Sequence, residues 1–272
     1  SELRQRLENG SAGLRVGVVD ACHAGGLTRA KGFTLGPPIS GEEPTTGSAL
    51  LVAAEATEMA QESDQLKGSF FTHFFVSGLR GAADINGDQR VSLAEIRTYT
   101  TEKTRFTTSS WARAVQHPVY HFDIRGRDDV VMSDLRAGDA QVHLGKSVVG
   151  HVVISEHNSP LVVVETDKRA GQSLSLALPR GRYVVHVRQQ KRIYLAEVTL
   201  PWGGSTRVEE GDLSPRSYQE VAQKGGVIEL RRHRLAVGIS MHTSLVKGMG
   251  LTPSVHVAYG FKLARVELGV EQ

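Results

Sequence analysis

The sequence predicts an α/β domain with a parallel sheet, followed by an all-β, sandwich-like domain and a C-terminal set of antiparallel strands. Residues 14–19 form a short β-branched run bounded by glycine, which is typical of a buried parallel strand. After residue 136, short strands with Gly and Pro turns replace the alternation of strands and helices. After residue 226, apolar residues alternate with small or polar ones. These changes of pattern place the domains at residues 1–135, 136–225 and 226–272.

The only cysteine, Cys22, directly follows the first predicted strand, in the segment Asp20-Ala21-Cys22-His23-Ala24-Gly25-Gly26. A turn of small residues at the carboxyl end of a parallel strand exposes the next side chain in a cleft. Such a polar, open setting favours a reactive thiolate over an inert buried thiol. We therefore interpret Cys22 as a candidate nucleophile.

This segment resembles the nucleophile segment of metacaspases and other caspase-like cysteine peptidases. Further segments resemble, in the same order, the strand, loop and helix that follow in bacterial caspase-like proteins; they are residues 55–63, 68–75, 78–84 and 116–120. The resemblance covers residues 12–135, about half of the chain. It implies a caspase-like fold and a cysteine endopeptidase that uses Cys22.

The resemblance also implies roles for the residues around Cys22. Asp20 would lie at the base of the primary specificity pocket, where its carboxylate would pair with an Arg or Lys side chain before the scissile bond. Glu58 would add negative charge to that pocket, or would be a solvated loop carboxylate. His23 and Gly25 belong to the turn whose backbone amides would hold the oxyanion. The expected partner is therefore a protein or peptide with a basic residue before the cleaved bond.

The general base of this chemistry has no counterpart in the sequence. Caspase-type catalysis uses a Cys-His dyad with the His about 50 residues upstream of the Cys, and the 21 residues before Cys22 contain no His. Either the chain lacks upstream strands, or it is a non-catalytic pseudoenzyme that acts as a binding or envelope-associated structural protein. Because a parallel sheet needs its central strands flanked on both sides, we favour the first explanation. We expect His73 to lie nearer the polar side of its helix.

Residues 84–95 resemble an EF-hand calcium loop, with candidate ligands Asp84, Asn86, Asp88 and Glu95. Position 6 of the loop is Gln89 instead of Gly, which disfavours the sharp turn around an ion. The competing interpretation is a polar turn before a helix, because Ser92 and Glu95 have the spacing of a capping box. Calcium is thus a candidate ligand, and the proposed chemistry requires no cofactor.

The second domain carries no convergent acid, base or metal cluster, so binding, spacing or scaffolding is its expected role. Its strands are predicted at residues 148–154, 161–164, 174–178, 183–187 and 193–198.

The C-terminal segments 235–241, 255–261 and 264–270 alternate with the period of strands. They fit either the opening strands of an outer-membrane β-barrel or a soluble meander. Association with an outer membrane through these strands is therefore one hypothesis for a partner.

Composition is that of a globular protein with enough apolar residues for one or two cores. The chain has 272 residues, of which 40% are hydrophobic, and a net charge of +3. Basic residues are not clustered as in a nucleic-acid surface, and we expect no nucleic-acid partner.

No apolar run reaches the length of about 18 residues that a spanning helix needs. An exported or envelope-associated location is favoured over a cytoplasmic one.

Overall fold

The computed structural model describes residues 12–22, 24–27, 45–63, 66, 68–111, 114–126, 129–159, 161–189, 192–216, 229–242 and 252–265. It is a mixed α/β structure with many strands and few helices. The chain forms two compact units, Ser1–Ser217 and Tyr218–Gln272. The predicted boundary at residue 135 falls inside the first unit, and the three-domain division stays a prediction.

The first sheet has three strands in the order β1-β2-β6. They span Leu14–Val19, Thr46–Val52 and Val119–Arg125. Strands β1 and β2 are parallel, whereas β2 and β6 are antiparallel. The expectation of a parallel sheet is therefore wrong for β6. The reason is that β6 begins beside the end of β2, where Val119 pairs with Val52, so it must run back along β2.

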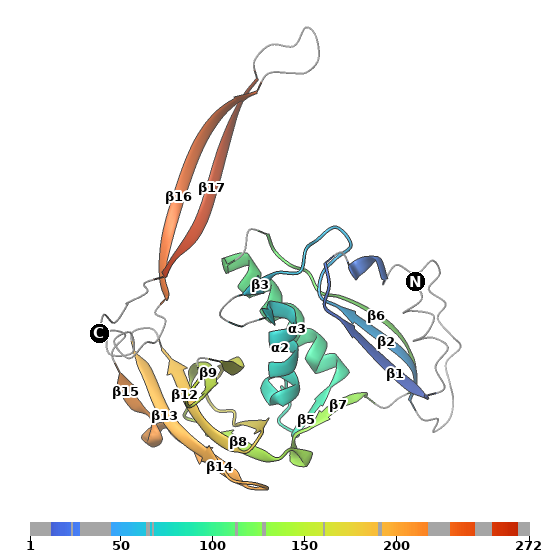
Figure 1. Cartoon of the computed structure of the whole chain (residues 1–272), viewed down its shortest axis with the longest axis vertical. Helices are drawn as coiled ribbons and strands as arrows, with labels where there is room; N and C mark the ends of the chain where they lie inside the picture. The colour runs from blue at the N-terminus through green and yellow to red at the C-terminus, as the bar shows by residue number, and fades with distance from the viewer. Residues whose placement is uncertain are drawn as a thin grey trace. The chain divides into compact units, whose positions relative to one another are not determined.

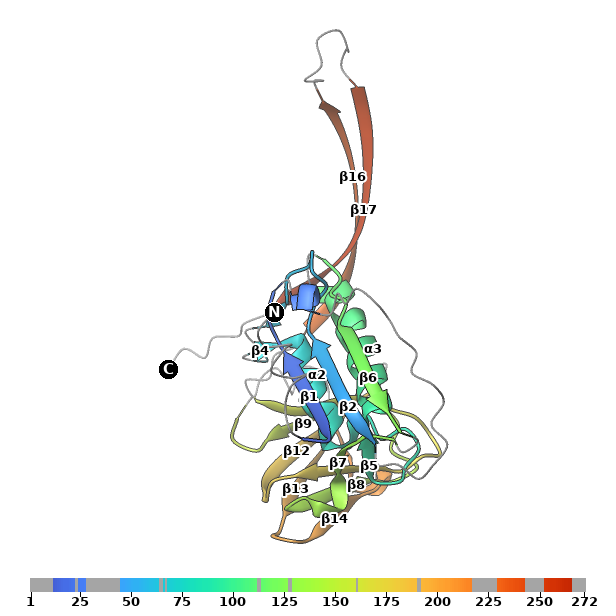
Figure 2. The same cartoon turned by 90° about the vertical axis from the view of Figure 1, so that its right-hand side faces the viewer.

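Helices α2 (Phe70–Ser77) and α3 (Leu93–Trp111) lie between this sheet and the later strands (Figures 1 and 2). Ser69 caps α2 because its side chain accepts a hydrogen bond from the Thr72 amide. Four phenylalanines of α2 are buried, namely Phe70, Phe71, Phe74 and Phe75. A π-helical turn, η2 (Gly78–Ala82), follows α2 directly.

The first unit also contains several short strands and helical turns. The strand pairs β3–β4 and β5–β7 are both antiparallel. Their bounds are Glu62–Ser63, Gly68–Ser69, Arg90–Ser92 and Val131–Asp134, and the short helical turns η1, η3 and η4 span Ala24–Leu27, Leu135–Ala137 and Glu210–Asp212.

The remaining strands of the first unit form two sheets, ordered β10-β9-β12-β13-β15 and β11-β8-β14. From β8 to β15 the strands span Ala140–Leu144, Gly150–Glu156, Val162–Lys168, Leu174–Leu178, Gly181–Arg188, Ile193–Leu200, Ser205–Val208 and Ser214–Arg216. Strands β9 to β13 confirm the five predicted strands, with ends that differ by a few residues.

A single apolar cluster joins the helices to both of these sheets. It includes Phe71 of α2, Ile96 of α3, Val164 of β10 and Leu176 of β11. Packing is close at Gly81, whose φ of 114° suits glycine and where a Cβ atom would lie 2.3 Å from the Ser175 carbonyl oxygen. The helices are therefore fixed against the β-rich part of the unit.

The second unit contains a hairpin of two antiparallel strands, β16 (Glu229–His242) and β17 (Thr252–Arg265). These strands contain the first two alternating segments predicted from the sequence. Of the third segment, residues 264 and 265 lie in β17 and residues 266–270 lie outside the described residues. Within the described part of the chain, no helix is both long and apolar enough to cross a membrane.

Candidate functional site

Cys22 lies three residues beyond the end of β1, and its side chain is exposed. The strand that leads to it pairs in parallel with β2, so the thiol stands at the carboxyl edge of the parallel pair. Crevices at this edge are the usual ligand sites of open α/β sheets. Cys22 is thus exposed beyond the end of a parallel strand, and its role as a nucleophile stays a prediction. His23 lies outside the described residues.

The Asp20 carboxylate is tied to the first turn of α2. Its Oδ2 atom accepts hydrogen bonds from the Ser69 hydroxyl and, at 2.6 Å, from Thr72 Oγ1. Ser69 is also the N-cap of α2, where helix dipoles favour a negative charge. Two hydroxyl donors therefore fix the orientation of the carboxylate two residues before Cys22. Its predicted role in choosing a basic substrate residue stays a prediction.

Glu58 is bound to His117. Its Oε1 lies 2.6 Å from His117 Nδ1, and its Oε2 accepts a hydrogen bond of 2.8 Å from the His117 amide. Both carboxylate oxygens are thus used to hold the segment that enters β6. This arrangement gives Glu58 a positioning role, and its contribution to a specificity pocket stays a prediction.

Gln116 fixes the connection that follows β2, a role the sequence analysis missed. Its side chain is fully buried, donates to the Ala53 carbonyl at 2.7 Å and accepts from the Gln61 amide at 2.8 Å. Its own amide donates to Thr108 Oγ1. The sequence signal for this residue was the Gln-His-Pro segment. The resemblance included that segment but gave no role to the Gln116 side chain.

Gly25 brings the Cys22 loop against this same connection. A Cβ atom at residue 25 would lie 2.4 Å from the Ala56 nitrogen and 2.6 Å from the Glu55 Cα. Only glycine permits so close an approach of two backbones. The loop after β1 therefore packs on the loop after β2, which Glu58 and Gln116 hold in place. The predicted part of Gly25 in an oxyanion site stays a prediction.

His73 pairs with a carboxylate, so its side of the helix is polar, as expected, but it does not face solvent. Its side chain is only 9% exposed, and its Nε2 lies 3.3 Å from Glu165 Oε2. The physical reason is that β10 packs against α2 and covers this side of the helix.

The loop of residues 84–95 makes its sharp turn despite Gln89, contrary to the sequence expectation. Gln89 itself adopts a φ of 64°, and its amide donates to Asp84 Oδ2. The capping box is confirmed, because Ser92 Oγ accepts from the Glu95 amide and Glu95 Oε2 accepts from the Ser92 amide. Burial raises the pKa of Asp84, and the charges of Glu95 and Asp88 act in the same direction.

The other two candidate ligands of this loop also bind backbone amides. Asn86 Oδ1 accepts from the Asp88 amide, and Asp88 Oδ1 accepts from the Arg90 amide, each at 2.8 Å. Among the described residues, no group of three or more His, Cys, Asp or Glu side chains is arranged to hold a metal ion. Calcium binding at this loop stays a prediction.

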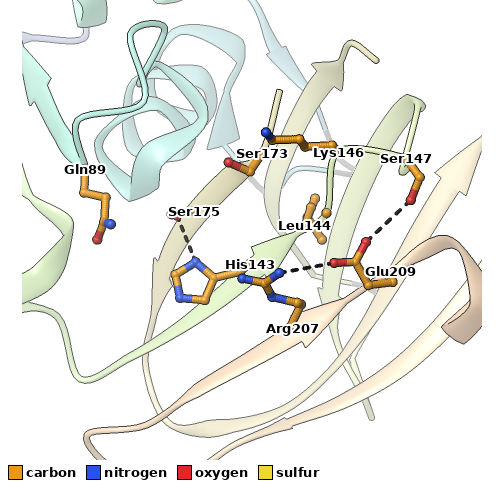
Figure 3. Close-up of a pocket in the computed structure, with 10 residues that line it drawn as sticks. Gln89, His143, Leu144, Lys146, Ser147, Ser173, Ser175, Arg207 and Glu209 are labelled. Carbon is orange, nitrogen blue, oxygen red and sulfur yellow. Dashed lines mark hydrogen bonds and ion pairs between the residues drawn. The ribbon is translucent and has the colours of Figure 1, made fainter. Parts of the chain in front are cut away.

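A separate cleft of about 530 Å³ lies over the β11-β8-β14 sheet (Figure 3). His143 on the central strand is paired in register with Ser175 on one side and Arg207 on the other. The His143 Nδ1 atom is 2.9 Å from Ser175 Oγ, and burial together with the charge of Arg207 lowers the pKa of His143. The residues lining this cleft come from position 89 onward, so it is not formed by the Cys22 loop.

Comparison with known proteins gives no relative from which a function can be transferred. No family model, curated protein or solved structure matches this chain.

Proposed function

We propose that the chain is part of a caspase-like cysteine endopeptidase that uses Cys22 as nucleophile and cleaves after Arg or Lys. The observation that carries the proposal is the exposed thiol of Cys22 at the carboxyl edge of the parallel β1–β2 pair. Its loop rests on a connection held by Glu58 and Gln116. Such preorganisation is what a catalytic loop requires.

The chemistry would follow the usual course of thiol acyl transfer. An imidazole takes the Cys22 proton, and the sulfur attacks the scissile carbonyl carbon to give a tetrahedral oxyanion held by backbone amides. The oxyanion collapses to a thioester as the imidazolium protonates the leaving amine. Water, deprotonated by the same imidazole, then hydrolyses the thioester and restores the thiol.

The imidazole would come from a strand beside β1. Among the described residues β1 is the edge of its sheet, with β2 on its other side. A further strand that pairs in parallel with β1 would end at the same edge as Cys22, so a histidine just after it would lie near the thiol. The catalytic His is therefore proposed to follow a strand of this kind.

Asp20 supports cleavage after a basic residue. It is an exposed carboxylate two residues from the thiol, and Ser69 and Thr72 hold it in one orientation. A fixed carboxylate of this kind binds a guanidinium or ammonium group by charge-assisted hydrogen bonds. Caspases that cleave after Asp instead require basic residues in this pocket.

The alternative is a pseudoenzyme that binds a partner without catalysis, with envelope association through the C-terminal strands as one form of it. The observation in its favour is that two described histidines already have carboxylate partners, His73 with Glu165 and His117 with Glu58. Among the described residues, neither of these imidazoles makes a hydrogen bond or ion pair to Cys22.

Hydrolysis of paired fluorogenic peptides ending in Arg and in Asp tests the proposal. The assay compares the chain with its Cys22→Ala variant, with and without calcium, and repeats the comparison on an N-terminally extended polypeptide. We expect cleavage after Arg that the Cys22→Ala substitution abolishes. Equal rates for the extended polypeptide and its Cys22→Ala variant would support the pseudoenzyme.

A further inference from the structure

Five ionisable side chains form a connected chain between the helices and the five-stranded sheet. They are His73 of α2, Lys103 of α3, His151 of β9, and Glu165 and Asp167 of β10. All four contacts join a carboxylate of β10 to a Lys or His side chain on another element, and two of them reach the helices. The cluster therefore lies where the helical layer meets the strands.

His151 has a carboxylate at each ring nitrogen. Its Nδ1 lies 2.8 Å from Asp167 Oδ1, and its Nε2 lies 3.0 Å from Glu165 Oε1. An ionised carboxylate only accepts hydrogen bonds, and a neutral imidazole has a single N–H. Both contacts are hydrogen bonds only if both nitrogens carry protons, so this geometry requires the imidazolium form.

The same two carboxylates also bind the helices. Glu165 Oε2 lies 3.3 Å from His73 Nε2, an ion-pair distance without the alignment of a hydrogen bond. Asp167 Oδ2 accepts a hydrogen bond from Lys103 Nζ. In addition, the Tyr99 hydroxyl of α3 donates to the backbone carbonyl of Glu165. Strand β10 is thus connected to β9 on one side and to α2 and α3 on the other.

The charges that surround His151 favour its protonated form. Burial alone would lower its pKa, but the hydrogen bonds to Asp167 and Glu165 and their charges raise it. Burial would raise the pKa of Glu165, yet the two imidazoles lower it. The hydrogen bond to His151, and then the charge of Lys103, lower the pKa of Asp167 against its partial burial. Arg188 of β12, the cross-strand neighbour of His151, is exposed.

Helix α2 connects this cluster to the loop of Cys22. Thr72 Oγ1 donates to Asp20, while the next residue, His73, faces Glu165. Consecutive residues of one helical turn therefore hold two carboxylates, one beside the thiol and one on β10. A displacement of this turn would be felt at both.

We propose that His73, Lys103, His151, Glu165 and Asp167 form a pH-dependent latch between helices α2 and α3 and strands β9 and β10. The latch is complete while both carboxylates are ionised and His151 carries two ring protons. When His151 loses one proton, one of the β10 carboxylates loses its hydrogen-bond donor on β9, and with it one of the two contacts that orient that carboxylate towards its partner on α2 or α3. The latch itself does not depend on the proposed peptidase activity. Only the importance of this coupling for a nucleophile at Cys22 rests on that proposed function.

Nuclear magnetic resonance titration of the whole chain tests the latch. The C–H resonances of the histidine rings are followed from pH 5 to 9, together with the backbone amides of residues 72–76. We expect His151 to titrate above 6.5 and the α2 amides to shift with the same midpoint. His186 of β12 is an internal comparison, because burial and then the charge of Arg188 lower its pKa to about 4.

Two variants separate the latch from general effects of pH. Asp167→Asn removes one of the two carboxylate charges that face His151, so the titration midpoint of His151 should fall. Asp139→Asn changes an exposed carboxylate of the same unit and should leave that midpoint unchanged. A His151 midpoint at or below 6.5 in the unmodified chain would overturn the proposal. So would α2 amides that do not follow the His151 titration.

Discussion

Glu58 Oε1 lies 2.6 Å from His117 Nδ1, while the other oxygen of the same carboxylate accepts the His117 amide. This pair joins the connection after β2 to the start of β6. Because Gly25 rests on that connection, the pair also supports the loop that carries Cys22. Removing the carboxylate should therefore be felt at the thiol as well as in the stability of the fold.

Glu58→Ala should lower the free energy of unfolding by about 1–2 kcal/mol, since two hydrogen bonds to a charged group are lost at a half-buried position. Urea denaturation measures this effect, and the rate of Cys22 alkylation reports on the loop. Glu62→Ala, an exposed carboxylate a few residues along, is the matched control and should change neither quantity. Equal effects from both substitutions would contradict the positioning role of Glu58.

Gly25→Ala and Gly26→Ala should differ sharply although they are neighbours. A Cβ atom at residue 25 would lie 2.4 Å from the Ala56 nitrogen, whereas a Cβ atom at residue 26 meets nothing within 4 Å. We expect Gly25→Ala to cost roughly 1–3 kcal/mol of stability and to change the alkylation rate of Cys22. Gly26→Ala should behave like the unmodified chain in both assays. Similar behaviour of the two variants would show that the loops do not pack closely.

Gln89→Gly should stabilise the protein, an unusual result for a substitution that removes a side chain. Gln89 has a φ of 64°, which costs a residue with a Cβ atom about 1 kcal/mol relative to glycine. Gly87→Ala is the opposite kind of change, at a residue whose φ is 76° and around which the space is open. It should destabilise the protein by about the same amount. Thermal unfolding measures both, and shifts of the same sign would refute the conformational explanation.

His186 should make the protein less stable as the solution becomes acidic. Burial, and then the charge of Arg188, lower its pKa in the folded state to about 4, from 6.5. A group whose folded pKa is depressed takes up its proton more readily in the unfolded chain, so stability is lost as the pH falls from 6.5 towards 4. His186→Gln should flatten the stability profile in this window. An unchanged slope in urea denaturation would show that other groups dominate.

Local sequence patterns were sufficient for the elements themselves. Alternation and Gly or Pro turns located β9 to β13, and the spacing of Ser92 and Glu95 identified the capping box at the start of α3. The small residues after β1 placed Cys22 beyond a strand end, where the thiol is exposed. These features depend on neighbours within a few residues, which a linear pattern records directly.

The arrangement of those elements was decided by tertiary structure. The antiparallel direction of β6, the burial of His73 against β10 and the binding of Glu58 to His117 join residues that are far apart in the sequence. No local pattern distinguishes a solvated carboxylate from one that meets an imidazole 59 residues away. The sequence by itself therefore determined the candidate nucleophile and the strands around it. Long-range packing decided which of these distant groups pair, because a charged or polar group that is brought out of water needs a partner.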